Sequence, residues 1–143
     1  MIYTDMTRKA INLCFKAHEG QLDNSGVPYV LHPVHVAEQM DTEDSTCVAL
    51  LHDVVEDTDY TLQDLVDAGF PDRIVEAVRC LTKKPGIDYM EYIKVVKTNP
   101  LATKVKLADM EHNSDLTRLN TVTDKDVRRN DKYQKARMYL END

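Results

Sequence analysis

An adjacent histidine and aspartate, His52 and Asp53, interrupt an otherwise apolar stretch of this chain. Val48-Ala49-Leu50-Leu51 precedes the pair, and Val54-Val55 follows it directly. Such a stretch is expected to be buried, and an imidazole and a carboxylate are costly to bury unless each finds a partner. A divalent cation is a partner that suits both groups. The pair therefore predicts that the chain folds around a metal site.

Two further acids, Glu56 and Asp57, follow this pair within one helical turn. The segment 45–57 is rich in helix formers, and Asp44 or Ser45 can cap its start, so we expect one helix here. Residues three and four apart share a helix face, which brings both acids close to the histidine-aspartate pair. The segment is therefore expected to carry two metal ligands and two carboxylates available for acid-base chemistry.

A metal site needs more than two protein ligands, and the chain offers a histidine before the pair and an acid after it. His32 lies between Pro28 and Pro33, and a residue that precedes a proline is biased away from helix. Asp109 lies within a long helical pattern. The predicted ligands are His32, His52, Asp53 and Asp109.

The remaining histidines are expected to have other roles. His35 lies one turn after His32, but on a helix that starts at Pro33 it is expected to face elsewhere. His18 and His112 are interpreted as surface or core groups with satisfied hydrogen bonds, and His18 is expected to bond locally in the wall of the site.

The whole pattern predicts an all-α, compact multi-helix fold. The chain of 143 residues has four glycines, little period-two alternation and no linker or repeat, so a single domain over 1–143 is expected. Thr61 with Asp64, and Thr123 with Asp126, have the spacing of capping boxes. A short strand around 26–31 is the weaker alternative. Helices are expected at about 4–19, 33–40, 45–57, 61–68, 71–82, 88–98, 100–119 and 123–141.

The charge distribution bears on the class of partner. The net charge of −7 argues against extended nucleic-acid binding, which needs several cations on one face. Residues 38–72 hold eleven acids and no Lys or Arg, whereas residues 79–106 hold seven bases and two acids. An acidic segment that bears ligands beside a basic segment suits a metal and a polyphosphate. The alternative for Lys94, Lys97 and Lys104 is a solvated helix face.

The sequence also indicates a location. It has no apolar run long enough to span a membrane, and its start lacks the apolar region of a signal peptide. Its three cysteines are odd in number and share no metal-ligand spacing, which favours buried thiols in a reducing cytoplasm. We therefore expect a cytoplasmic protein without a membrane partner; the pattern predicts no oligomeric state.

These motifs resemble those of the HD-domain phosphohydrolases, which have a histidine, then a His-Asp pair, then a distant aspartate. Within that family the chain is similar to the hydrolase domain of RelA/SpoT homologues, and to the small stand-alone alarmone hydrolases in particular. The similarity spans about His18 to Tyr133. It is carried by Gly20-Gln21, Ser25-Gly26-Val27-Pro28-Tyr29, His32-Pro33, the segment Leu50 to Thr58, Leu81-Thr82-Lys83, Val105 to Asp109 and His112-Asn113.

The resemblance implies an activity and a role for each matching residue. The activity is removal of the 3′-pyrophosphate from the guanosine tetra- and pentaphosphates ppGpp and pppGpp. Glu56 and Asp57 match a catalytic pair that handles the attacking water and the leaving group. One Mn²⁺, or another divalent transition metal, is implied at His32, His52, Asp53 and Asp109, and substrate contacts at Ser25, Asn113, Arg129 and Tyr133.

Two positions depart from the family pattern. Asp23-Asn24 stands where alarmone hydrolases usually carry basic residues stacked on guanine, and Leu116 stands where a small polar residue or an acid is more common. A carboxylate removes the flat cationic surface for a base. Two alternatives therefore stay open. One is an HD phosphohydrolase acting on another nucleotide or phosphate ester, and the other is a non-catalytic nucleotide-binding or antitoxin-like module.

Overall fold

The computed structural model describes residues 1–142, and helices dominate this part of the chain. The weaker alternative of a strand at 26–31 is reduced to one isolated bridge between Leu22 and Pro28. The all-α prediction is therefore confirmed. The elements are α1 (Asp5–Ala17), α2 (Leu31–Glu38), α3 (Glu43–Leu51), α4 (Val54–Asp57), α5 (Leu62–Asp67), α6 (Asp72–Leu81), α7 (Tyr89–Lys97), α8 (Pro100–Asn113), a 3₁₀ helix η1 (Leu116–Arg118) and α9 (Asp124–Glu141).

Helix α3 is the centre of the fold and contacts α1, α2, α6 and α8. Every residue from 45 to 51 is buried, and a helix that is apolar all round belongs in the interior. The hydroxyls of Ser45 and Thr46 donate to the carbonyl of Thr42 at 3.2 and 2.7 Å, so burial leaves neither unpaired. This helix holds the first residues of the site in a rigid interior.

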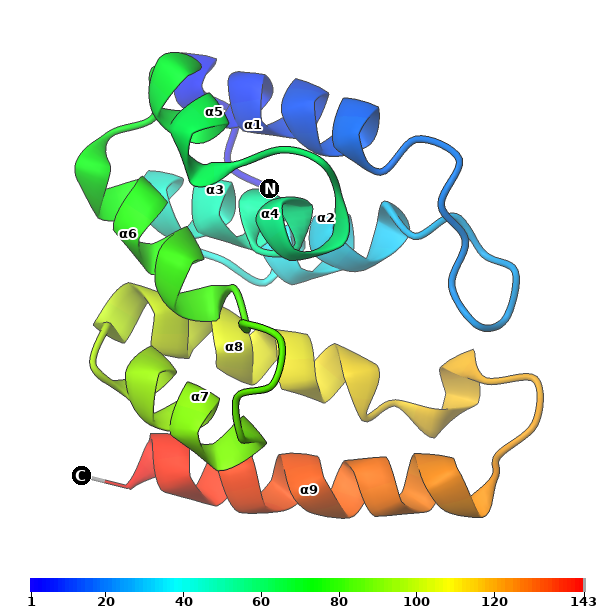
Figure 1. The fold of residues 1–143 in the computed structure, drawn as a ribbon. Coiled ribbons are helices and arrows are strands. Elements are labelled where there is room, and N and C mark those ends of the chain that lie inside the picture. Colours follow the sequence, from blue (N-terminus) through cyan, green and yellow to red (C-terminus); the bar gives the residue numbers. More distant parts are fainter. Residues whose placement is uncertain (143) are drawn as a thin grey trace.

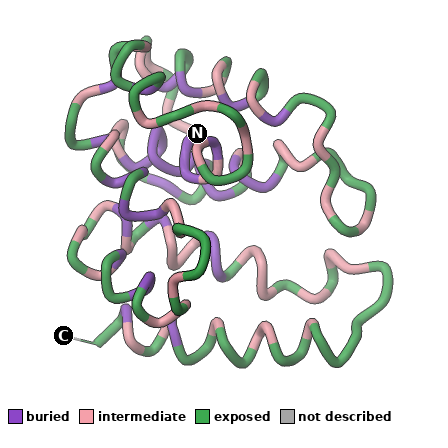
Figure 2. The backbone as a smooth tube through the Cα atoms, viewed as in Figure 1, coloured by how far each residue is buried: buried purple, intermediate pink, exposed green. Residues whose placement is uncertain are grey.

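The helices form two layers with α6 running between them (Figure 1). One layer contains α1, α2 and α3, and the other contains α7, α8 and α9. The layers meet where α8 contacts α2 and α3. Helix α9 covers α7 and α8. Its buried residues are Ala136 and Leu140, and much of the rest of the helix is exposed (Figure 2). The predicted ligands therefore lie at the boundary between the layers, His32 on α2, Asp109 on α8, and His52 and Asp53 directly after α3.

The expected single helix over 45–57 is wrong. Helix α3 ends at Leu51 and α4 begins at Val54, with His52 and Asp53 in a turn between them. Asp53 has φ −103° and ψ −3°, which interrupts the helical hydrogen bonding. The pair thus sits at a helix break rather than in the middle of a helix.

The start of α3 also differs from the expectation. Thr42, not Asp44 or Ser45, is the N-cap: its hydroxyl accepts the backbone N–H of Ser45 at 3.1 Å. The Ser45 hydroxyl in return accepts the N–H of Thr42 at 3.3 Å, which completes a reciprocal cap. The capping boxes expected at Thr61 and Thr123 are confirmed.

His32 is helical, contrary to the bias expected before a proline. Helix α2 begins at Leu31, which places His32 and Pro33 in the first turn. A proline is tolerated there because the first-turn N–H groups have no partner within the helix.

Helix α8 is shorter than expected. It begins at Asn99 and Pro100 as predicted but ends at Asn113 instead of continuing to 119. Asp115 accepts the N–H of Thr117 at 3.0 Å and starts η1, because a side-chain acceptor of this kind competes with the helical ladder.

Within residues 1–142, no helix combines the length and the apolar content needed to cross a bilayer.

Cys14, Cys47 and Cys80 are buried and free, as expected. Burial raises the pKa of Cys14 and Cys47 to about 12, so both thiols stay protonated at neutral pH.

Replacing Leu50 by alanine is expected to lower the free energy of unfolding by about 2–5 kcal/mol, because a fully buried side chain leaves a cavity. Leu22 is 63% exposed, and the same change there is expected to cost less than about 0.5 kcal/mol. Urea denaturation of Leu50→Ala and Leu22→Ala measures both. Equal losses would contradict the central position of α3.

Candidate metal centre

The four predicted ligands meet at the boundary between the layers. One ligand atom from each lies within 4.8 Å of the others. The Nε2 atom of His32 is 2.7 Å from Oδ1 of Asp109 and 3.8 Å from Oδ2 of Asp53. The Nε2 atom of His52 is 3.0 Å from Oδ2 of Asp53 and 3.3 Å from Oδ1 of Asp109. Two imidazole nitrogens and two carboxylate oxygens at these separations form a cluster that could hold one divalent cation.

The helix break explains how two neighbouring residues serve one centre. On a continuous helix, adjacent side chains point about 100° apart. Between α3 and α4 the chain turns, and His52 and Asp53 both face the cluster. The Nδ1 atom of His52 lies 2.5 Å from the carbonyl of Ala49, which can only accept a hydrogen bond. With a cation bound, His52 therefore carries its proton on Nδ1 and presents the Nε2 lone pair to the cluster.

Two buried carboxylates on one centre need local stabilisation. Nζ of Lys106 is 2.9 Å from Oδ2 of Asp109, and the two side chains are 12% and 5% exposed. Burial by itself raises the pKa of Asp109, but Lys106 and the hydrogen bonds from His32 and His52 together outweigh it and hold that pKa well below its usual range. For Asp53, burial again acts upward, and the neighbouring His52 lowers the pKa to about 2. Both acids are therefore ionised at neutral pH.

Lys106 and Tyr29 are the residues that the sequence reasoning missed. The hydroxyl of Tyr29 donates to Oδ2 of Asp53 at 2.6 Å and so orients that carboxylate. Lys106 lies three residues before Asp109 on α8, a spacing that puts both on one helix face and could have indicated the ion pair. For Tyr29, the sequence carried no comparable signal, because the contact joins the turn before α4 to the segment before α2.

A cavity of about 200 Å³, here called the inner cavity, opens beside the four ligand positions. Glu56 and Asp57 reach it from α4, as the sequence reasoning expected, although they lie beyond the helix break. Lys83 and Lys106 bring positive charge to the same space. Its lining consists of Tyr29, Asp53, Glu56, Asp57, Lys83, Tyr89, Tyr92, Lys106, Asp109, Asn113 and Tyr133.

The two acids of α4 differ in their contacts. Oε1 of Glu56 accepts the backbone N–H of Lys83 at 2.6 Å, which fixes this carboxylate. Burial, followed by the nearby charge of Asp53, raises the pKa of Asp57 to about 6. Burial likewise raises the pKa of Glu56, while the Lys83 amide acts in the opposite direction. At neutral pH a fraction of Asp57 therefore keeps its proton in a space where Glu56 is held as an acceptor.

A second space, the outer cavity, adjoins the inner cavity and has a volume of about 240 Å³. The four predicted substrate contacts Ser25, Asn113, Arg129 and Tyr133 all line it. Asn113 and Tyr133 line both cavities, and Nδ2 of Asn113 donates to Oδ1 of Asp109 at 3.1 Å. The two cavities thus meet at a residue that contacts the ligand cluster.

Asp23, one of the departures from the family pattern, has a structural role in the wall of the outer cavity. Its Oδ1 atom accepts the N–H groups of Ser25 and Val27 at 2.8 and 3.0 Å, which shapes the loop before α2. The guanidinium of Arg118 lies 4.0 Å from the other carboxylate oxygen and lines the same cavity. A planar cation therefore enters this wall from η1 instead of from position 23 or 24. Leu119, rather than Leu116, belongs to the lining.

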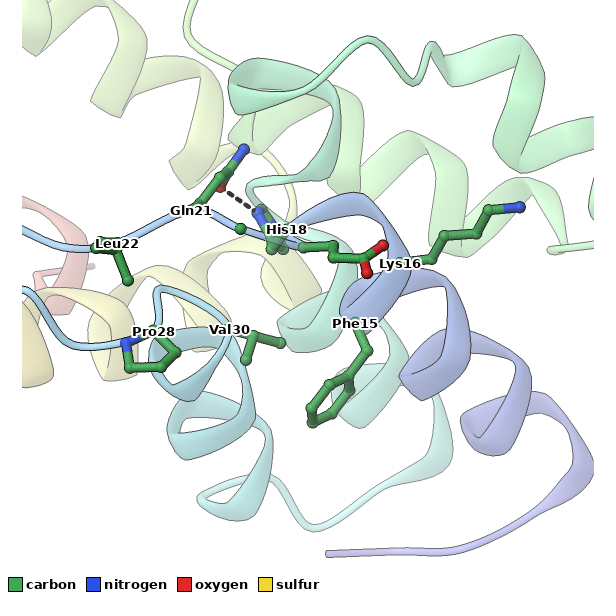
Figure 3. A pocket seen from close by; sticks show the side chains of 9 residues that line it. Phe15, Lys16, His18, Gln21, Leu22, Pro28 and Val30 are labelled. Atoms are coloured by element: carbon green, nitrogen blue, oxygen red, sulfur yellow. Dashed lines mark hydrogen bonds between the residues drawn. The ribbon is translucent and has the colours of Figure 1, made fainter.

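A further cavity, of about 470 Å³, lies away from the ligand cluster on the outer side of His18. Phe15, Leu22, Pro28 and Val30 make it mainly apolar (Figure 3). The Nδ1 atom of His18 lies 2.8 Å from Oε1 of Gln21, the local hydrogen bond that the sequence predicted. Nε2 of Gln21 donates to the carbonyl of Asp57 at 3.1 Å. This wall therefore braces the end of α4.

The fold and the ligand cluster define an HD domain, and comparison with known families agrees. The family model for the HD domain matches residues 10–138, and the chain belongs to this family. A solved structure of a metazoan SpoT ortholog that hydrolyses ppGpp superposes with a TM-score of 0.77. It is 23% identical, and the match covers 98% of this chain and 87% of that one. The fold is therefore shared with that protein.

Curated relatives are similar over part of their length. The guanosine-3′,5′-bis(diphosphate) 3′-pyrophosphohydrolase of Vibrio cholerae is 47% identical over 80 residues, which are 52% of this chain and 11% of that protein. The bifunctional (p)ppGpp synthase/hydrolase SpoT of Escherichia coli K12 is 33% identical over 121 residues, 74% of this chain and 17% of that protein. The chain thus spans less than a fifth of either relative.

Asp109→Ala is expected to abolish stoichiometric Mn²⁺ binding, because it removes the one ligand supplied by α8. Asp131→Ala, on the exposed side of α9, is the matched control and should bind the metal like the unaltered chain. Isothermal titration with Mn²⁺ followed by elemental analysis measures both variants. Full occupancy of Asp109→Ala would reject Asp109 as a ligand.

Proposed function

We propose that this HD domain is a metal-dependent phosphohydrolase that removes the 3′-pyrophosphate from ppGpp and pppGpp, giving GDP or GTP and pyrophosphate. The observation that carries the proposal is the inner cavity, where the two carboxylates of the ligand cluster, two acids of raised pKa and two lysines share one space. The activities of the similar Vibrio cholerae and Escherichia coli proteins support the same reaction.

His32, His52, Asp53 and Asp109 would hold the cation, and Mn²⁺ is the proposed ion. The donor set fits a borderline divalent metal, since it combines two imidazole nitrogens with two carboxylate oxygens. Such an ion supplies Lewis-acid stabilisation of a phosphoryl oxygen and lowers the pKa of an attacking water.

The two acids of α4 suit the two proton transfers that hydrolysis needs. Glu56, held by the Lys83 amide, is placed to accept a proton from water as it attacks phosphorus. Asp57, with a pKa of about 6, is placed to give a proton to the 3′-oxygen as its bond to phosphorus breaks. Acid-base assistance of this kind accelerates reactions by roughly 10²–10⁴. One proton is taken and one is returned, so the pair ends with its net charge unchanged.

Some basic residues line the two cavities, and others contact groups elsewhere on the protein. Lys83 and Lys106 line the inner cavity, and Arg118 and Arg129 line the outer one, where they suit phosphate groups. Lys94, Lys97 and Lys104 contact Glu91, the carbonyls of Tyr139 and Asn142, and Asp41, respectively. These contacts favour the alternative that the three lysines belong to solvated helix faces.

The second candidate is hydrolysis of another nucleotide, and the Asp23 carboxylate in the outer cavity favours it. Incubation with Mn²⁺ and ppGpp, pppGpp or a panel of nucleoside monophosphates distinguishes the candidates. Pyrophosphate release supports the proposed reaction, and orthophosphate from a monophosphate supports the second. Nucleotide binding without turnover would leave a non-catalytic module.

Cytoplasmic location and the single-domain organisation over 1–143 remain predictions.

Glu56→Gln is expected to lower turnover at least about 10²-fold while Mn²⁺ stays bound. The amide oxygen of glutamine can still accept the Lys83 N–H, so the change removes the basic carboxylate and keeps the loop in place. Single-turnover kinetics and metal analysis on the same sample test this. Unchanged turnover would remove Glu56 from the mechanism.

Asn24→Arg is expected to tighten guanine-nucleotide binding about threefold or more, because it adds a stacking cation at the outer cavity. Asn24 is exposed, whereas Asp23 is engaged in the loop, so Asn24 is the position that tolerates the change. Equilibrium dialysis with ppGpp compares the variant with Asn24→Gln. Identical binding constants would refute a role for position 24 in base recognition.

A further inference from the structure

Three imidazoles extend in a row from the ligand cluster toward the surface. The rings of His32 and His112 have centres 4.9 Å apart and planes only 10° from parallel, and their Nδ1 atoms are 2.7 Å apart. The facing nitrogens therefore lie between the ring centres, in the in-plane direction in which an imidazole donates and accepts. His35 stacks on His112 with centres 4.0 Å apart and planes at 19°.

A nitrogen pair at 2.7 Å shares one proton, and the metal centre determines which ring carries it. His32 directs Nε2 to the cluster, 2.7 Å from Asp109, so Nε2 is its ligand atom. A neutral imidazole that offers a lone pair at Nε2 must carry its proton at Nδ1. The Nδ1 atom of His112 must then be the acceptor, with the proton of His112 on its own Nε2.

The two histidine ligands are fixed in different ways. The Nδ1 proton of His52 goes to the carbonyl of Ala49, a group that can only accept and that no substitution removes. The Nδ1 proton of His32 goes to a side chain. Outer partners of this kind typically change metal affinity 10–100-fold when they are lost. The tautomer of His32 therefore depends on the residue at position 112.

We propose that His112 is a positioning residue of the metal centre, because it accepts the Nδ1 proton of His32 and holds the Nε2 lone pair toward the cation. His35 supports it by stacking on its outer face. The backbone of His112 is also fixed, since Arg118 donates to its carbonyl at 2.8 Å. The inference rests on the proposed metal centre but not on the identity of the nucleotide.

The test compares two substitutions of nearly equal size in the full chain. Asn at position 112 places an amide oxygen near the position of Nδ1 and can accept the proton, whereas Leu cannot. His112→Leu is expected to weaken Mn²⁺ binding 10–100-fold, and His112→Asn to stay within about threefold of the unaltered chain. Both variants lose the stack on His35, so their difference isolates the accepted hydrogen bond. Isothermal titration measures the affinities, and circular dichroism verifies that both variants fold.

A second measurement locates the shared proton directly. Long-range ¹H–¹⁵N spectra of the chain loaded with Zn²⁺, a diamagnetic substitute for Mn²⁺, should show His32 protonated at Nδ1 and His112 unprotonated at Nδ1. The reverse assignment, or equal Mn²⁺ affinities for the Leu and Asn variants, would overturn the proposal. If the unaltered chain binds no Mn²⁺, the metal centre itself fails. If it binds while His112→Leu binds equally well, only the role of His112 fails.

Discussion

Two ionised carboxylates held side by side in the protein interior are the constraint on which the rest of the structure depends. Asp53 and Asp109 repel each other and lose hydration, so the fold must stabilise both. Lys106 pairs with one and Tyr29 donates to the other, while two imidazoles lie between them. The site is therefore held in place by its own surroundings, and it offers a cation a ready set of donors instead of one assembled on binding.

The rigid elements around this cluster have separate tasks. Helix α3 is buried on all sides and anchors His52, and the break after it turns Asp53 to the same centre. Helix α8 carries Asp109 together with the lysine that neutralises it. Beyond the break, α4 is held by Gln21 and by the Lys83 amide, which keeps its acids beside the cluster. Ligands, acids and cations thus come from different elements and converge on one inner cavity.

The sequence predicted much of this, and its errors have physical reasons. Apolar spacing and caps located the helices, and the polar residues in apolar surroundings identified the cluster. The helix over 45–57 was wrong because local propensity does not register the turn that His52 and Asp53 make to face one centre. The contact from Tyr29 to Asp53 and that from Arg118 to the outer cavity depend on how distant segments pack, which periodicity does not encode.

The division of the ligands between the layers has a consequence for the stability of the protein in the cell. His32, His52 and Asp53 belong to one layer and Asp109 to the other, so a bound ion would join them as a cross-link does. An ion present at 100 times its dissociation constant adds about 2.7 kcal/mol to the native state. Cellular abundance would then follow the supply of the ion, and scarcity would expose the chain to proteases before it limited the rate of the enzyme.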